Sequence, residues 1–166
     1  MKKKAADAID QLDADHLCVH ALFQSYRELV RARATPLKRR ALAEEICMEL
    51  TIHAKLEEEL FYPAVRDALQ DEDLVDAAED QHGSLREFVG QILATAPQDE
   101  LYDARVAMLA DYVERHVCQE REQVFNRVLA SRTDLQALGR AIATRREELR
   151  AVSEALREDA LASALA

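Results

Sequence analysis

The sequence has few residues that interrupt helices: three glycines, three prolines and no tryptophan among 166 residues. Glycine and proline disfavour helix interiors most, so their scarcity argues against a fold rich in tight turns and short strands. Alanine, leucine, glutamate, arginine and aspartate dominate instead, and all of these except aspartate are acceptable or strong helix formers. The composition therefore predicts an all-α protein, and the length suffices for one domain with a hydrophobic core.

Other features are scarce too, and each absence narrows the class of protein. No apolar run approaches the ~18–20 residues of a membrane span. Segment 1–4 is basic, but no apolar stretch follows it, so we expect no signal peptide. Cys18, Cys47 and Cys118 are odd in number and dispersed, which argues against a disulfide framework. We expect a cytoplasmic protein with no membrane partner.

An excess of basic charge is also missing. The 32 acidic residues outnumber the 22 lysines and arginines, which leaves a formal net charge of −10 at pH 7. Nucleic acid is a polyanion, and proteins that bind it usually carry a basic surface. We therefore expect no nucleic-acid partner.

Breaker residues and capping signals divide the chain into five expected helices. Thr35 and Pro36 form an N-cap with a proline at the first helical position, and Pro63 is expected to kink the second helix or end its regular part. Short connections predict an up-down-up-down four-helix bundle in residues 1–132 and an additional C-terminal helix in residues 133–166. The expected spans are about Ala5–Arg33, Pro36–Leu69, Leu74–Ala96, Asp99–Ala130, and from the boundary at Ser131–Asp134 to near the C-terminus.

Each of the first four helices carries a stripe of apolar residues spaced three and four apart, and a histidine interrupts each stripe. Two of these histidines are followed four residues later by a glutamate on the same helix face. A buried carboxylate is costly unless it is paired or coordinated, so the two glutamates need a common cation. The six interrupting residues are His16, His53, Glu57, His82, His116 and Glu120.

Four imidazoles and two carboxylates turned into one core predict a site for two metal ions. A carboxylate has two oxygens, so Glu57 and Glu120 could bridge two ions that each bind two histidines. This donor set suits iron, and also manganese or zinc, with remaining positions for water, an oxo or hydroxo bridge, or a diatomic ligand. A single core histidine, or a single histidine–glutamate pair, is more often structural. Six such residues on four matching stripes favour metal, because a structural role would leave two buried glutamates unpaired.

Nearby polar residues are predicted to stay outside this set. His20 follows His16 by four residues but lies beside the stripe, as a rim residue or a contact of a ligand. Glu79 precedes His82 by three residues, the spacing of ferritin-type sites, which need two copies. Glu79 is either an exposed flanking charge or an acceptor for a histidine N–H. Glu58, Glu59 and Glu122 are predicted to be solvated or rim charges.

The segments around these residues resemble the hemerythrin-like family, in its HHE cation-binding branch. The resemblance covers about residues 5–130, and its most specific part is I-H-A-K-L-E-E-E-L-F-Y-P-A at residues 52–64. The other matching segments are Asp15-His16 with Leu22-Phe23, residues 79–82 and residues 112–120. The resemblance implies a four-helix bundle with a non-haem di-iron site whose ligands fall on the six residues above. His20 falls at a position that is not a ligand in this family.

Two departures shape the expected function. Oxygen-carrying members have a second histidine where Arg86 stands, and a more distant aspartate in place of Glu120. The resemblance thus implies two iron ions that bind or react with O2, peroxide or nitric oxide, rather than a reversible oxygen carrier. Two alternatives stay open: an iron or oxygen sensor that signals through the C-terminal helix, and simple metal storage. Whether the protein is an enzyme is also open.

The expected C-terminal helix carries a heptad stripe of its own, interrupted by Arg145. Such a stripe needs an apolar surface to cover it. It could fold back on the bundle or pair with another subunit, as a homodimer or with a different protein. The residues of the stripe are Leu135, Leu138, Ile142, Leu149, Val152 and Leu156.

Overall fold

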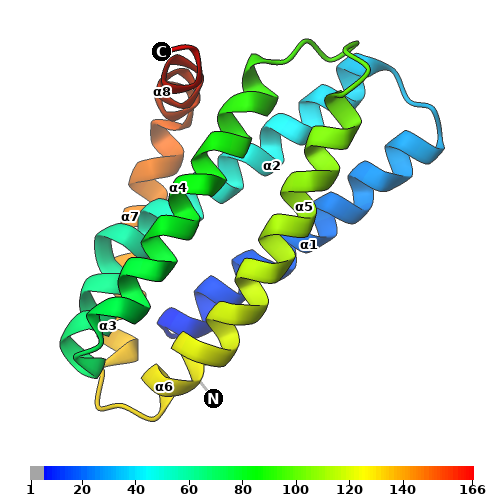
Figure 1. Cartoon of the computed structure of the whole chain (residues 1–166). Helices are drawn as coiled ribbons and strands as arrows, with labels where there is room; N and C mark the ends of the chain where they lie inside the picture. The colour runs from blue at the N-terminus through cyan, green and yellow to red at the C-terminus, as the bar shows by residue number, and fades with distance from the viewer. Residues whose placement is uncertain (1–5) are drawn as a thin grey trace, which may run out of the picture.

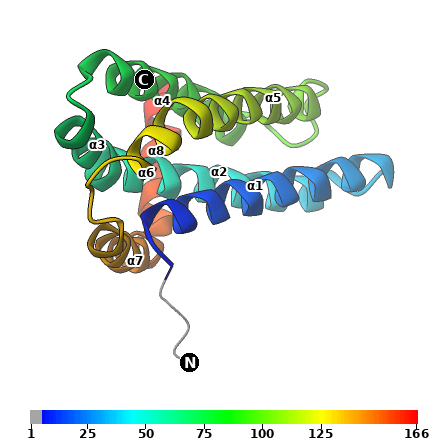
Figure 2. The same ribbon diagram turned by 90° about the horizontal axis from the view of Figure 1, so that it is seen from below.

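The computed structural model describes residues 6–166, which form helices joined by short connections (Figure 1). α1 (Ala8–Arg31) and α2 (Pro36–Leu56) make one antiparallel pair, and α4 (Glu72–Ala94) and α5 (Tyr102–Glu120) make a second. Figure 2 shows these pairs as two layers. The predicted all-α bundle is confirmed. The expected helix start at Ala5 and the basic segment before it lie outside the described residues.

Side-chain caps explain where the helices begin. The side chains of Asp7 and Asp10 each accept a hydrogen bond from the other residue's N–H, which forms a capping box at the start of α1. Thr35 caps α2 as predicted. Asp71 accepts a hydrogen bond from the N–H of Leu74, so α4 begins slightly before the predicted residue.

The second and fourth bundle helices each contain a π-helical segment. α2 continues as η1 (Glu57–Phe61) and α3 (Tyr62–Leu69), and α5 continues as η2 (Arg121–Phe125) and α6 (Asn126–Leu129). Pro63 has no N–H and its ring crowds the carbonyl four residues before it, so the regular helix ends at Leu56. The helix expected at about Asp99–Ala130 is present, and its residues 121–125 are π-helical although no proline marks that segment. Both π segments lie at or directly after a glutamate of the predicted site, and such segments are frequent at functional sites.

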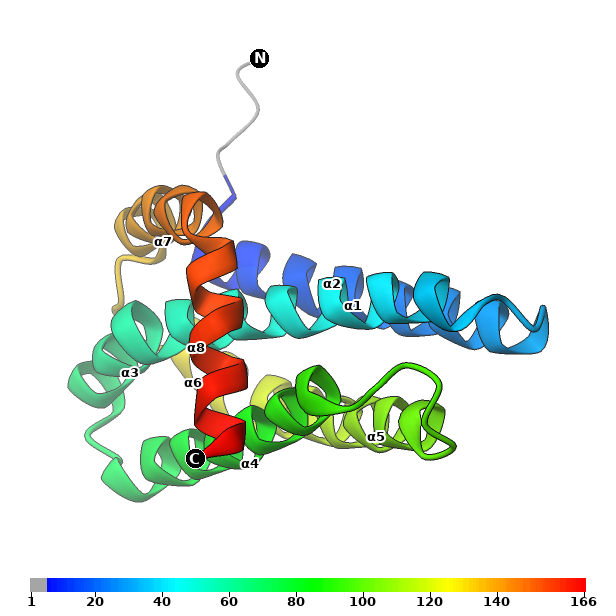
Figure 3. The same cartoon turned by 90° about the horizontal axis from the view of Figure 1, so that it is seen from above.

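The C-terminal extension folds back on the bundle as two helices, α7 (Leu135–Ala151) and α8 (Ser153–Leu165), which meet at Val152. Ile142 and Leu149 are buried in an apolar cluster with residues of the bundle. At Gly139 a Cβ would lie 2.9 Å from the backbone nitrogen of Ala8, so only glycine allows this close approach. α8 crosses the bundle and contacts α2 and α4 (Figure 3). The division at residues 132 and 133 stays a prediction.

Two apolar clusters fill the bundle, one on each side of a polar layer. One includes Val19, Leu50 and Leu85, and the other includes Leu12 and Leu56. The predicted site therefore lies between two water-excluding regions. Within residues 6–166, no helix is long and apolar enough to span a membrane.

Candidate metal centre

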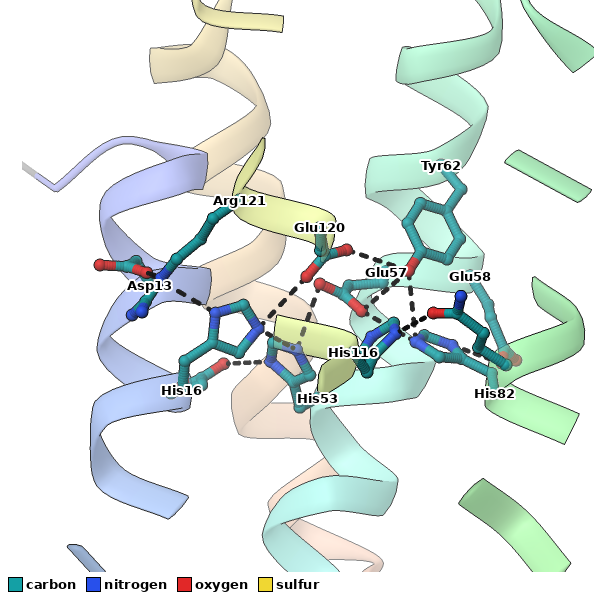
Figure 4. Close-up of polar contacts among 12 residues, drawn as sticks. Asp13, His16, His53, Glu57, Glu58, Tyr62, His82, His116, Glu120 and Arg121 are labelled. Atoms are coloured by element: carbon teal, nitrogen blue, oxygen red, sulfur yellow. Dashed lines mark hydrogen bonds and ion pairs between the residues drawn. The ribbon is translucent and has the colours of Figure 1, made fainter. Parts of the chain in front are cut away.

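Six buried polar or charged side chains lie in the core of the described chain, and they are the six residues that the sequence predicts as ligands. They project from α1, from α2 and the start of η1, from α4 and from α5, toward one point between the helix pairs (Figure 4). The most exposed of them retains only 8% of its accessible surface. They are His16, His53, Glu57, His82, His116 and Glu120.

Their donor atoms form two groups that share Glu57. His16, His53, Glu57 and Glu120 each place one donor atom within 4.8 Å of the others, and Glu57 does the same with His82 and His116. Because Glu57 offers one oxygen to each group, it can hold two cations together. Glu120 lies in the first group only.

The imidazole Nε2 atoms converge on these carboxylates. The Nε2 of His53 lies 3.1 Å from Oε1 of Glu57, and the Nε2 of His82 lies 3.1 Å from Oε2 of the same residue. The Nε2 of His16 lies 3.2 Å from Oε2 of Glu120 and 3.1 Å from the Nε2 of His53. Lone pairs of two imidazoles that face each other at this distance need a proton or a metal ion between them.

Outer residues accept a hydrogen bond from the second ring nitrogen of three of the four histidines. The Nδ1 of His53 donates to Asp15 at 3.1 Å, that of His82 to Glu58 at 3.0 Å, and that of His116 to the side-chain oxygen of Gln81 at 2.6 Å. The Nδ1 of His16 lies 3.6 Å from Asp13, which is beyond hydrogen-bond distance. An acceptor at Nδ1 fixes the ring so that the Nε2 lone pair points inward, which is how proteins orient metal-binding histidines. The prediction that Glu58 is only a solvated or rim charge was therefore incomplete.

Buried donor atoms at the centre also remain unsatisfied. Among the described residues, Oε1 of Glu57, Oε2 of Glu120 and Nε2 of His116 have no hydrogen-bond partner. A buried polar atom without a partner costs about 1–3 kcal/mol. These three atoms can each accept, and no donor reaches them in hydrogen-bond geometry, so the residues present fit a metal ion.

The carboxylates also create a strong negative potential at the rings. Burial acts to lower the pKa of His53, but the charge of Glu57 and the hydrogen bond to Asp15 outweigh it and raise that pKa to about 10. Burial is likewise outweighed at His82, whose pKa is raised to about 9 by Glu57 and Glu58. His116 is bound to a neutral amide, and burial lowers its pKa to about 4. Positive charge is thus favoured at the two rings that contact both Glu57 and an outer carboxylate.

Tyr62 is a member of the site to which the sequence analysis assigned no role. Its hydroxyl is buried and lies 3.2 Å from Oε2 of Glu57, 3.0 Å from Oε1 of Glu120 and 3.2 Å from the Nε2 of His82. Burial raises its pKa well above the usual value, and both glutamates add to this, so the hydroxyl stays protonated and donates. Its position five residues after Glu57 points inward because the π segment changes the phase of the helix.

The neighbouring candidates lie outside the cluster. His20 is exposed and contacts Gln24 at 3.0 Å. Glu79 pairs with Arg66 at 3.0 Å, so of its two predicted roles it takes that of a flanking charge. Glu59 pairs with Arg145 at the surface.

The comparisons with known proteins agree with this geometry. The family described as hemerythrin HHE cation-binding domain matches residues 7–128. A protein from Nostoc sp. that is named a DNA nickase is 32% identical over 116 residues, which is 70% of this chain and 32% of that protein. The chain thus spans about a third of the length of this curated relative.

A crystal structure of a hemerythrin HHE cation-binding domain-containing protein from Mycobacterium kansasii has the same fold. Its TM-score is 0.74 at 24% identity, and the match covers 93% of this chain and 99% of the other. This coverage exceeds residues 7–128, so the structural likeness extends into the C-terminal extension.

Proposed function

The chain belongs to the hemerythrin HHE cation-binding family, and we propose that it binds two iron ions between its two helix pairs. In this proposal His16, His53 and Glu120 would hold one ion, the two histidines of α4 and α5 would hold the other, and Glu57 would contribute to both. The observation that carries the proposal is the pair of donor groups that share Glu57 within 4.8 Å. Manganese or zinc could occupy the same donors.

Iron in this site would supply redox chemistry toward O2, peroxide or nitric oxide. The chain's own residues bind and orient: the outer acceptors fix the imidazole rings, and Tyr62 donates to Glu120 at 3.0 Å. Apolar residues such as Val19, Leu50 and Leu85 line a cavity of about 10 Å³ beside the histidines. A single water needs roughly 10–15 Å³, so this space admits a ligand no larger than about one water molecule.

A groove between α1 and α5 shares lining residues with this cavity. Its volume is about 510 Å³, and it is lined by His16, His20, Arg27 and Arg121, among others. His16 lines both the groove and the inner cavity. We propose that small ligands enter through this groove, past the ring of His16.

The Nostoc relative is named a DNA nickase, but we do not extend that activity to this chain. Two-metal centres can cleave phosphodiesters, so the donor set does not exclude it. The net charge of −10 opposes binding to a polyanion, and the chain spans only 32% of that relative. Relaxation of a supercoiled plasmid by the metal-loaded protein would overturn this expectation.

The test is metal content and turnover on the same sample. Elemental analysis of protein loaded anaerobically with ferrous iron should find about two irons per chain. Rapid consumption of peroxide, O2 or nitric oxide by this sample would support reactivity. Two irons without turnover would favour a sensory or storage role, and failure to bind iron, manganese or zinc would overturn the proposal.

A further inference from the structure

Arginines of the C-terminal extension pair with carboxylates of α1, α2 and η1. Most of these pairs lie at the surface, where ion pairs contribute little. The pair of Arg146 and Asp15 differs, because only 14% and 16% of their side-chain surfaces are exposed. The other pairs are Arg145–Glu59, Arg150–Glu49 and Arg157–Glu44.

The guanidinium of Arg146 donates two hydrogen bonds to the carboxylate of Asp15. Its Nη1 donates to Oδ1 at 2.8 Å and its Nη2 donates to Oδ2 at 2.9 Å. The same Oδ2 accepts from the Nδ1 of His53 at 3.1 Å. A continuous chain of contacts therefore leads from α7 through Asp15 to a ring whose Nε2 faces Glu57.

Two other histidines also have an arginine–carboxylate pair beside their Nδ1 atom, but those arginines belong to the bundle itself. Arg86 of α4 donates to Glu58, which holds His82. Arg121 of η2 donates to Asp13, which lies near His16. Arg146 is different because it lies outside the family match at residues 7–128 and belongs to the C-terminal extension.

We infer that Arg146 is a positioning residue for the metal centre, and that docking of α7 and metal binding at His53 are therefore coupled. This inference rests on the proposed function. A planar two-pronged pair fixes the carboxylate of Asp15, which in turn holds the ring of His53. Coupling between two events is reciprocal, so metal bound at His53 should also hold α7 more tightly on the bundle.

The extension has enough apolar contact to stay folded without this pair. Ile142 and Leu149 are buried in the cluster that includes Leu12 and Leu56. An Arg146→Gln variant should therefore keep its helices, which circular dichroism can verify. Arg145→Gln is the matched control, because Arg145 is adjacent on α7 and its partner Glu59 contacts no histidine of the site.

The experiment measures the affinity of the full chain for ferrous iron by anaerobic competition with a chelator. Loss of an outer partner of a metal ligand typically weakens binding by about 10–100-fold, and we expect about ten-fold for Arg146→Gln. Arg145→Gln should stay within about two-fold. Arg146→Lys should recover only part of the loss, because lysine keeps the charge without the planar fork.

A double variant separates positioning from general destabilisation. If Arg146 acts through Asp15, Asp15→Asn combined with Arg146→Gln should bind iron no more weakly than Asp15→Asn alone. Hydrogen exchange in residues 135–151 should slow when iron is added to the wild type, but not in Arg146→Gln saturated with iron. Wild-type affinity in Arg146→Gln, or an equal loss in Arg145→Gln, would overturn the inference alone. A wild type that takes up no metal would overturn the proposed function, and the inference with it.

Discussion

Replacement of Glu57 by glutamine tests the centre at the residue that both donor groups share. Glu57 is fully buried, and its two oxygens lie 3.1 Å from the Nε2 atoms of His53 and His82. Glutamine preserves the shape but removes the charge, and its amide nitrogen is no metal ligand. One position loses its oxygen donor and the other keeps only a neutral carbonyl oxygen, so we expect the variant to fall from about two metal ions per chain to below one.

The magnitude follows from binding linkage. A site occupied at a hundred times its dissociation constant stabilises the folded state by about 2.7 kcal/mol, so two sites filled to this degree contribute about 5 kcal/mol. For a chain of this size, 1 kcal/mol corresponds to roughly 2–4 °C in melting temperature. Metal should therefore raise the melting temperature of the wild type by roughly 10–20 °C and that of Glu57→Gln by a few degrees at most.

The assay is thermal unfolding with and without metal, combined with elemental analysis. Glu59→Gln is the matched control, because Glu59 lies on the same π segment and pairs with Arg145 at the surface. Loss of that surface pair should cost less than about 1 kcal/mol and leave metal content unchanged. Two metal ions per chain and a full temperature shift in Glu57→Gln would refute the assignment of Glu57 as the shared ligand.

Three further predictions concern single positions. His20→Ala should keep its metal, because His20 is exposed and contacts Gln24, whereas His16→Ala should lose it; metal loss in His20→Ala would contradict the ligand assignment on α1. Gly139→Ala should destabilise the fold by about 1–3 kcal/mol in chemical denaturation, since its Cβ would meet backbone at 2.9 Å, while Gly83→Ala, with open space at its Cβ, should stabilise α4 by up to about 1 kcal/mol. Tyr62→Phe should lower the free energy of unfolding of the metal-free protein by about 1–3 kcal/mol, because buried carboxylates lose a donor; an unchanged value would argue against these hydrogen bonds.

The sequence alone was sufficient to identify the six buried polar residues of the site. A helix has 3.6 residues per turn, so residues spaced three and four apart must share a face. A histidine in the middle of an apolar face can only point into the core, and a glutamate four residues later must join it. This local geometry is why His53 and Glu57 could be paired without knowledge of any other helix.

The helices themselves followed from composition and caps, with two exceptions. No proline in the sequence predicts the π segment after Glu120, in contrast to the segment before Pro63. The break at Val152 has no glycine or proline either. Local propensity, the basis of the helix predictions, contains no signal for either change of backbone.

Tertiary structure decided which residues stand around the ligands. Asp15, Glu58 and Gln81 reach histidines on other helices, and such contacts depend on how far neighbouring helices slide and rotate against each other. Tyr62 enters the centre only because a π turn shifts its direction. Arg146 lies 131 positions from Asp15 in the chain and reaches it only because α7 folds back on α1 and α2.

The sequence by itself thus determined which side chains must be buried together, because helix periodicity is local. Only the packing of the helices decided what holds those side chains in place, because that depends on distances between segments far apart in the chain.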